Sequence, residues 1–366
     1  MDWLRDTISA NGPLYLAVGG LVIGCAFGAV LFRTNFCAMG SLSDIHNFGD
    51  FRRFRAWLLA AAIALIGAQL LQAAGVVALD KSMYLAPGLN WAGHIIGGVA
   101  LGFGMVFAGG CPSRNLARAG GGDLRALLTL VVVGLFAYMT IGGIFAPPRA
   151  ALEQATAVGR MAGAPTQSLG DVIGSAVAMP TGARNGIVAA LLGGAAIVYC
   201  FVDRSFRGSP VHIVSGLAVG LAVIAGWALT GLAHDEMAAR PSAPISLTYV
   251  RPAGDALEWL QRFTAIPIPS FGVASVFGAL IGACIAALAM GRFRFTTFSD
   301  TGDTVRHLAG AALMGIGGVM ALGCTIGQAV TGVSTLAAGS ILTFAAIIAG
   351  GFWGLRVLER QILAGG

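Results

Sequence analysis

Three short segments interrupt an otherwise apolar chain, and each places a cysteine beside glycine and hydrogen-bonding side chains. They are residues 33–40 with Cys37, residues 109–120 with Cys111, and residues 323–332 with Cys324. Backbone that leaves helical geometry inside a membrane survives only where protein or a cavity surrounds it, because lipid cannot satisfy its N–H and C=O groups. If the three segments are re-entrant, they predict a path lined by three thiols.

Basic and amide side chains accompany these cysteines. Arginine at membrane depth is costly and usually functional, so arginines next to two of the thiols indicate an anionic substrate. The alternative is that they are ordinary cytoplasmic anchors. The candidates for substrate binding and conduction combine three thiols, three arginines, two amides and two glycines: Cys37, Cys111, Cys324, Arg33, Arg114, Arg118, Asn115, Gln328, Gly110 and Gly323.

The remaining cysteines and two histidines have simpler interpretations. Cys25, Cys200 and Cys284 lie within uninterrupted apolar runs, where a thiol behaves as a small buried hydrophobe. No CxxC or Cys/His spacing occurs, so neither a disulfide framework nor a metal site is predicted. His94 and His307 are either proton carriers or interfacial anchors, and the sequence leaves both alternatives open.

The elements that position these residues must cross a membrane. Hydrophobic residues make up 57% of the 366 positions and charged residues only 10%, which is too little polar surface for a water-soluble globule. The 55 glycines suit membrane helices, which pack through small residues. The net charge of +6 is not gathered on a soluble domain, so lipid is the expected surrounding and nucleic acid is not an expected partner.

Hydrophobic runs of spanning length predict an all-α integral membrane protein with about nine transmembrane helices. Some runs are short or interrupted by glycine, and these are candidates for re-entrant half-helices. The expected spans are residues 13–32, 56–78, 94–110, 123–146, 185–202, 209–232, 268–290, 306–323 and 338–356.

Two of these runs are copies of one eighteen-residue phrase. Residues 94–111 and 307–324 align at an offset of 213, and eight of the eighteen pairs are identical, including both histidines and both cysteines. A weaker match relates residues 20–34 to residues 216–230. The chain therefore contains an internal repeat, with Asn115 equivalent to Gln328.

Arginine placement predicts that the repeat is inverted. Short loops rich in arginine stay in the cytoplasm, whereas long loops cross with little regard to charge. This rule places residues 52–55, 114–125, 204–207, 292–294 and 356–360 inside, and the two copies then run in opposite directions. The expected organisation is a first half at 1–146, an external connecting segment at 147–184 and a second half at 185–366. The N-terminus is expected outside and the C-terminus in the cytoplasm.

At these residues the chain resembles the YeeE/YedE family of bacterial membrane proteins, which import thiosulfate. The resemblance rests on Arg33-x-x-Phe36-Cys37-x-x-Gly40, on Gly109-Gly110-Cys111 with Arg118-Ala119-Gly120, and on Gly323-Cys324-x-Ile326-Gly327. It implies an hourglass-shaped inverted repeat in the bacterial inner membrane with a positively charged outer hollow. It also implies that Cys37, Cys111 and Cys324 pass thiosulfate inward, with no cofactor and no enzymatic step.

Thiol chemistry is consistent with that implication. The terminal sulfur of thiosulfate accepts weak hydrogen bonds from neutral thiols, while its oxygens require N–H and guanidinium donors. Pro112-Ser113-Arg114 replaces the small residues of many relatives, so a selenium oxyanion or another small anion is an alternative substrate.

A different class of function also fits the cysteines. A membrane sulfur-transfer or redox protein would persulfidate one of them transiently, which requires a reactive thiolate instead of an unreactive thiol. A cytoplasmic sulfur-carrier protein is an expected partner in either case, because imported sulfane sulfur must be captured.

Overall fold

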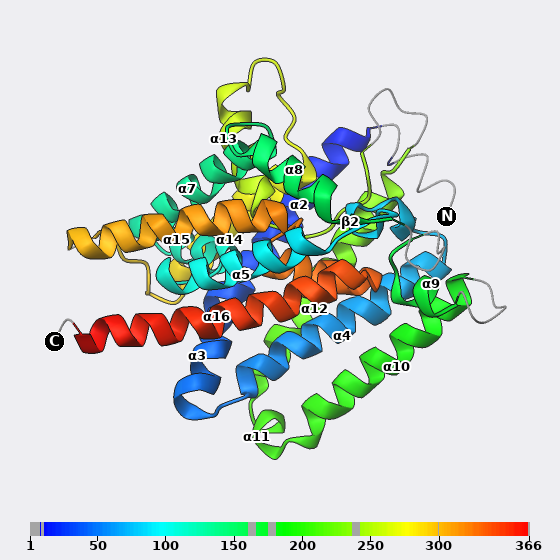
Figure 1. Ribbon diagram of the computed structural model, residues 1–366, viewed down its shortest axis with the longest axis horizontal. Coiled ribbons are helices and arrows are strands. Elements are labelled where there is room, and N and C mark those ends of the chain that lie inside the picture. The colour runs from blue at the N-terminus through cyan, green and yellow to red at the C-terminus, as the bar shows by residue number, and fades with distance from the viewer. Residues whose placement is uncertain are drawn as a thin grey trace.

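The structure is a computed structural model that describes residues 8, 11–159, 166–174, 181–235, 242–298 and 300–364. Helices dominate the described residues (Figure 1). The sheet they contain is one antiparallel pair, in which β1 (Leu89–Asn90) pairs with β2 (Ala157–Val158). The prediction of an all-α protein is confirmed.

The helices before the connecting segment include one clear interruption, between α5 and α6. In order they are α2 (Gly12–Thr34), α3 (Ala38–Phe48), α4 (Arg52–Ala73), η1 (Leu79–Lys81), η2 (Met83–Leu85), α5 (Trp91–Phe107), α6 (Pro112–Gly120) and α7 (Leu124–Ile141). The connecting segment contains α8 (Ala146–Thr156) and α9 (Leu169–Gly174).

The later helices repeat that interruption between α15 and a short π-helix, η4. They are α10 (Thr181–Val202), α11 (Arg204–Arg207), α12 (Pro210–Leu232), α13 (Arg251–Gln261), α14 (Phe271–Ala289), α15 (Thr301–Met320), η4 (Gly327–Gly332), η5 (Val333–Thr335) and α16 (Ala338–Ala364).

Eight helices among the described residues are long and apolar enough to cross a membrane. They coincide with eight of the nine expected spans. The ninth, expected at 306–323, is α15, a helix of 20 residues that carries Asp303 and Arg306 in its first two turns and is not among those eight. The chain is a multi-pass membrane protein.

The two copies of the repeat cross each other in opposite directions. A Cβ added to Gly97 of α5 would lie 2.6 Å from the carbonyl oxygen of Gly317 in α15, and one added to Gly317 would lie 2.6 Å from that of Gly97. Gly104 and Gly310 make the same reciprocal contact, also at 2.6 Å. Since Gly97 is equivalent to Gly310 and Gly104 to Gly317, the contact has the reciprocity of a two-fold axis.

The neighbouring helices follow the same two-fold relation. Each packs against a helix of the other half. A Cβ on Gly20 of α2 would lie 2.7 Å from the carbonyl oxygen of Phe271 in α14. The equivalent Gly216 of α12 lies against Ala56 of α4 at the same distance. Small residues allow these close approaches, which drive helix association where lipid offers no hydrophobic gain. Each half is therefore built partly from contacts with the other.

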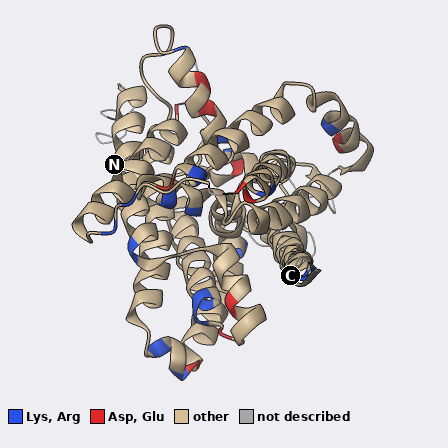
Figure 2. Ribbon diagram, turned by 90° about the vertical axis from the view of Figure 1, so that its left-hand side faces the viewer, with Lys and Arg blue, Asp and Glu red and all other residues tan. Residues whose placement is uncertain are grey.

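The arginine-rich connections gather at one end of the bundle (Figure 1). Arg55 pairs with Asp203 at 2.5 Å, and His46 in the last turn of α3 pairs with Glu359 of α16 at 3.0 Å. The backbone of Asp123 pairs with that of Thr296, which joins the loop before α7 to the loop before α15. Figure 2 views the ribbon from this end and shows basic residues, in blue, distributed across it.

Candidate functional site

Both copies of the repeat break at the same point and in the same way. The N–H of Gly110 donates to the carbonyl of Met105 at 2.9 Å, and the N–H of Gly323 donates to that of Gly318 at 2.8 Å. Gly109 and its equivalent Leu322 both adopt left-handed backbone, with φ of +67° and +59°. This helix ending satisfies the last carbonyls and turns the chain sharply. A cysteine, Cys111 or Cys324, follows each break directly.

Two equivalent amides hold the breaks from within. The Nδ2 of Asn115 donates to the carbonyl of Gly110 at 2.8 Å, and the Nε2 of Gln328 donates to that of Ala321 at 2.5 Å. Their oxygens, Oδ1 and Oε1, are buried without a hydrogen-bond partner in the structure. Buried polar atoms are rarely left unpaired, so these oxygens are available to a ligand or water.

The three predicted cysteines are buried and form a series. Cys37 caps α3, where its sulfur accepts from the N–H of Gly40 at 3.4 Å. The thiols of Cys37 and Cys111 are close neighbours, and the sulfur of Cys111 lies 3.3 Å from Ser113 Oγ. Thr325, which follows Cys324, is also close to Cys111. The structure thus brings together all three thiols that the sequence singled out.

Cys324 occupies the other end of this series, toward the face that carries α13. Its sulfur accepts from the N–H of Gly327 at 3.3 Å and lies 3.8 Å from Thr248 Oγ1. Tyr84 and Tyr249 are its other neighbours. Sequence reasoning missed all three hydroxyl residues, because they come from loops with no repeat or motif to mark them.

Arg114 lies beside the inner pair of thiols. Its half-buried guanidinium is close to Cys37 and Cys111, with Arg118 and Arg53 as its nearest charged neighbours. Arg53 pairs with Asp44 at 3.3 Å, but among the described residues Arg114 makes no ion pair with a carboxylate. An arginine in this position can bind an anion beside the two thiols.

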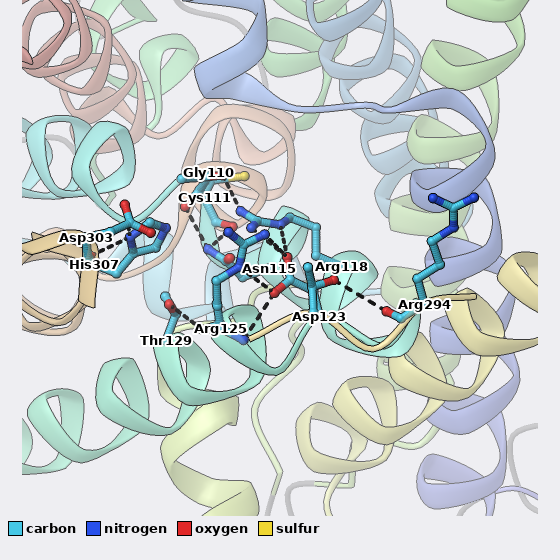
Figure 3. A network of polar contacts seen from close by, with 12 residues as sticks. Gly110, Cys111, Asn115, Arg118, Asp123, Arg125, Thr129, Arg294, Asp303 and His307 are labelled. Carbon is cyan, nitrogen blue, oxygen red and sulfur yellow. Dashed lines mark hydrogen bonds and ion pairs between the residues drawn. The ribbon is translucent and has the colours of Figure 1, made fainter. Parts of the chain in front are cut away.

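Arg118 is instead occupied by the protein (Figure 3). Its Nη2 pairs with Asp123 at 2.7 Å, and its Nη1 donates to the carbonyl of Gly109 at 2.7 Å. Asp123 also accepts from Arg125 Nε at 3.1 Å. Burial raises the pKa of Asp123, but the hydrogen bonds from Arg125 and Arg118 outweigh it and hold that pKa below its usual range. Arg118 therefore anchors the break that precedes Cys111.

Other candidates lie away from the thiols. Arg33 is exposed in the last turn of α2, where left-handed Asn35 turns the chain before Cys37. His94 is buried with Nδ1 2.7 Å from Thr343 Oγ1, and His307 places Nδ1 2.9 Å from the carbonyl of Asp303. Cys200 is buried and points to the carbonyl of Arg55 at 3.3 Å.

A cavity of about 1020 Å³ adjoins the Cys324 end of the series. Thr248, Leu322 and Gly323 line its inner end, next to Cys324. Its charged described lining balances two arginines against two acids: Arg149, Arg251, Asp235 and Asp255. The resemblance implied a positively charged hollow, whereas these lining side chains are of mixed sign: the second half supplies Asp235, Arg251 and Asp255, and the connecting segment supplies Arg149.

Comparisons with known proteins identify the family of the chain. Residues 33–353 match a protein family described as sulphur transport. The chain is similar to the thiosulfate transporter TsuA of Spirochaeta thermophila, at 29% identity over 353 residues, which covers 93% of this chain and 99% of that protein. It is 28% identical over 325 residues to TsuA of Escherichia coli, covering 86% of each chain. The probable transporter YedE of Salmonella typhimurium is 30% identical over 127 residues, which is 34% of this chain and 29% of that one.

Proposed function

This chain belongs to the YeeE/YedE family of sulphur transport proteins, and from that premise we propose that it takes thiosulfate into the cytoplasm across the bacterial inner membrane. Family membership makes it a transport protein and not an enzyme. The proposed route runs from the outer cavity past Cys324, then Cys111, then Cys37.

The observation that carries the proposal is a series of neighbouring buried groups that can form hydrogen bonds. Thr248 contacts Cys324, Thr325 lies near Cys111, and Cys111 lies near Cys37. A neutral thiol is a weak donor, so each sulfur contact is loose enough to be exchanged for the next. Sulfate has no terminal sulfur to accept such contacts, which supplies a basis for selectivity without covalent chemistry.

The oxygens of the anion require stronger donors. In our proposal Arg114 binds them beside Cys37 and Cys111, because its guanidinium is half-buried and has no carboxylate to neutralise it. Asn115 and Gln328 hold the two breaks open, with Gly110 and Gly323 giving the backbone room. Arg118 acts as a positioning residue, through Gly109, and Arg33 acts at most as an electrostatic attraction from the surface.

The direction of uptake follows from the arginine-rich end. Short basic loops remain on the cytoplasmic side. The start of α4 with Arg55, the start of α7 with Arg125 and the loop with Arg294 share one end of the bundle, and α16 ends there as well. We therefore assign this end, and the C-terminus, to the cytoplasm.

The test is uptake of labelled thiosulfate into proteoliposomes, with sulfate as competitor. Cys37→Ala, Cys111→Ala and Cys324→Ala should each abolish uptake, while Cys200→Ala, a buried cysteine outside the series, should retain it. Uptake that survives in all three variants would refute the thiol route.

The same preparation separates transport from sulfur transfer. Mass spectrometry of the intact protein after turnover should show unmodified cysteines. A persulfide that accumulates on Cys37, Cys111 or Cys324 and is discharged to a cytoplasmic sulfur-carrier protein would instead establish the transfer mechanism.

A further inference from the structure

Two tyrosine hydroxyls are buried beside Cys324 without a partner. Tyr84, from η2, is 2% exposed, and Tyr249, from the extended segment before α13, is 0% exposed. Neither hydroxyl makes a hydrogen bond in the structure, although Thr248 lies near the first and Ser275 near the second. Both donors are therefore unsatisfied at the outer end of the thiol series.

The tyrosine rings are held firmly, so the hydroxyls have defined positions. Tyr249 stacks on Phe27 with ring centroids 5.3 Å apart, and Tyr84 meets Trp227 edge-on at 6.4 Å. The ring of Tyr84 runs along η4, and its hydroxyl lies 3.5 Å from where a Cβ of Gly327 would stand. Gly327 is also the residue whose N–H donates to the sulfur of Cys324.

Leaving such hydroxyls unpaired is unfavourable. A buried donor without an acceptor destabilises the folded protein, and here two occur next to the same thiol. Thr325 Oγ1, also buried without a hydrogen bond, adds a third group between Cys324 and Cys111. A ligand with several acceptor atoms would satisfy all of them together.

Resting on the proposed uptake of thiosulfate, we propose that Tyr84 and Tyr249 donate hydrogen bonds to the sulfonate oxygens of the anion while Cys324 contacts its terminal sulfur. These three side chains form an outer binding station for a small sulfur oxyanion. The groups that act on these three side chains are hydroxyls, thiols and backbone N–H groups, so the donors of the station itself are neutral, while Arg149 and Arg251 lie in the adjoining cavity.

This arrangement divides the work between oxygen and sulfur. Sulfate and thiosulfate both present oxygens, so the tyrosines provide affinity without distinguishing the two. Cys324 meets the atom that sulfate lacks, so it provides the preference. Substitutions at the two kinds of residue should consequently have different signatures.

The experiment compares Tyr84→Phe and Tyr249→Phe with Tyr15→Phe, whose side chain is exposed at the start of α2. The first two changes remove only a hydroxyl and keep the ring contacts. A hydrogen bond to a charged group contributes enough that each should raise the KM for thiosulfate uptake about 10-fold or more. The thiosulfate-to-sulfate preference should stay the same, whereas Cys324→Ser should reduce it. Tyr15→Phe should match the wild type.

Thermal unfolding distinguishes binding from a structural role. Without substrate, Tyr84→Phe and Tyr249→Phe should keep or raise the Tm, because the deleted hydroxyls have no protein partner. The rise in Tm produced by thiosulfate should shrink in both variants. A lower Tm without substrate, together with an unchanged KM, would show that the hydroxyls have a structural role. That result would refute the proposal that they bind the anion.

The outcomes also separate this inference from the proposed function. Wild-type protein that takes up thiosulfate, together with tyrosine variants of normal KM, would refute the outer station and leave the uptake proposal standing. Wild-type protein that neither binds nor takes up thiosulfate would refute both.

Discussion

The break before α6 and the break before η4 share one backbone design but carry different side chains. Each has a left-handed residue, a cysteine and an amide that grips the broken turn. At the repeat offset of 213, however, Arg114 corresponds to Gly327 and Arg118 corresponds to Thr331. The two breaks have the same backbone geometry, but only the break before α6 carries arginine at these two positions.

The difference teaches how an anion could be moved without being trapped. The outer break surrounds Cys324 with hydroxyls from Thr248, Tyr84 and Tyr249. The inner break offers a second thiol, Cys37, and a cation. In the proposed route the anion passes from a cavity of mixed charge through neutral donors to a cation that has no carboxylate partner, and this order would draw it toward Arg114 by electrostatics.

Removing the inner cation is the strongest way to break this comparison. We expect Arg114→Gln to lower uptake at limiting thiosulfate by about 10-fold to 100-fold, because hydrogen bonds to a charged group contribute about 1.5–3 kcal/mol. Uptake into proteoliposomes measures it. Arg204→Gln, on the exposed α11, is the control and should have little effect. Equal uptake in the Arg114 variant and the wild type would contradict the proposed asymmetry.

Adding a methyl group to each break tests the backbone. Gly110 has φ of +149°, and its Cβ would lie 3.0 Å from Arg114 Cγ. We expect Gly110→Ala to lower the free energy of unfolding by about 1–3 kcal/mol, the usual cost of such backbone. The equivalent Gly323 lies outside the positive-φ range, and its Cβ would meet Gln328 Nε2 at 3.4 Å, an ordinary contact. Denaturant unfolding should therefore show a smaller loss for Gly323→Ala, and equal losses would argue against distinct breaks.

Leu322 allows the opposite test. It is one of three non-glycine residues with positive φ among those described, and its equivalent in the first half is Gly109. Left-handed backbone costs an L-residue about 1–2 kcal/mol. Leu322→Gly should relieve that strain and, after the entropy that glycine adds to the unfolded chain, raise stability by at most about 1 kcal/mol. A loss of stability measured by unfolding would show that the Leu322 side chain contributes more than its backbone costs.

Acidification should destabilise only the break before α6, and this is the smallest effect that we expect. Asp123 fastens that break through Arg118, whereas the equivalent outer position of Arg118, Thr331, donates to the carbonyl of Leu247 at 2.8 Å and carries no charge. Because the folded-state pKa of Asp123 is lowered, its contribution is complete above the ordinary aspartate pKa of about 4 and disappears as pH falls through the lower folded value.

The measurement is Tm as a function of pH for the wild type and Asp123→Asn. The wild type should be the more stable above about pH 4, and the difference should narrow below it. A difference in Tm that persists unchanged to the lowest pH would mean that the charge of Asp123 does not contribute to its interaction with Arg118.

The sequence predicted most of the scaffold, because membrane helices have a strong local signal. The repeated phrase at 94–111 and 307–324 also located both breaks and their cysteines. Glycines mattered twice in that phrase, once as close contacts at Gly97 and Gly104 and once as the turn at Gly109 and Gly110. The eight long apolar helices needed no knowledge of tertiary contacts.

The chemistry around the thiols was harder to predict because it depends on loops. Tyr84 and Thr248 are far apart in sequence and meet only when η2 and the segment before α13 converge on Cys324. Arg33 looked close to Cys37, but α2 ends between them and leaves the guanidinium exposed. For Arg118 a signal existed in Asp123, five residues later, where an acid is available to occupy the arginine.

The glycine crossing of α5 and α15 has a consequence for how turnover proceeds. A transporter whose halves rock against each other needs a surface along which they can slide. At Gly97 and Gly104 of α5 even a methyl group would overlap the backbone of α15. The helices on either side also pack against helices of the other half. The crossing therefore holds α5 and α15 in a fixed position relative to each other. Motion during a transport cycle is left to side chains and to the outer loops, and a chemical crosslink between α5 and α15 should leave the rate of transport unchanged.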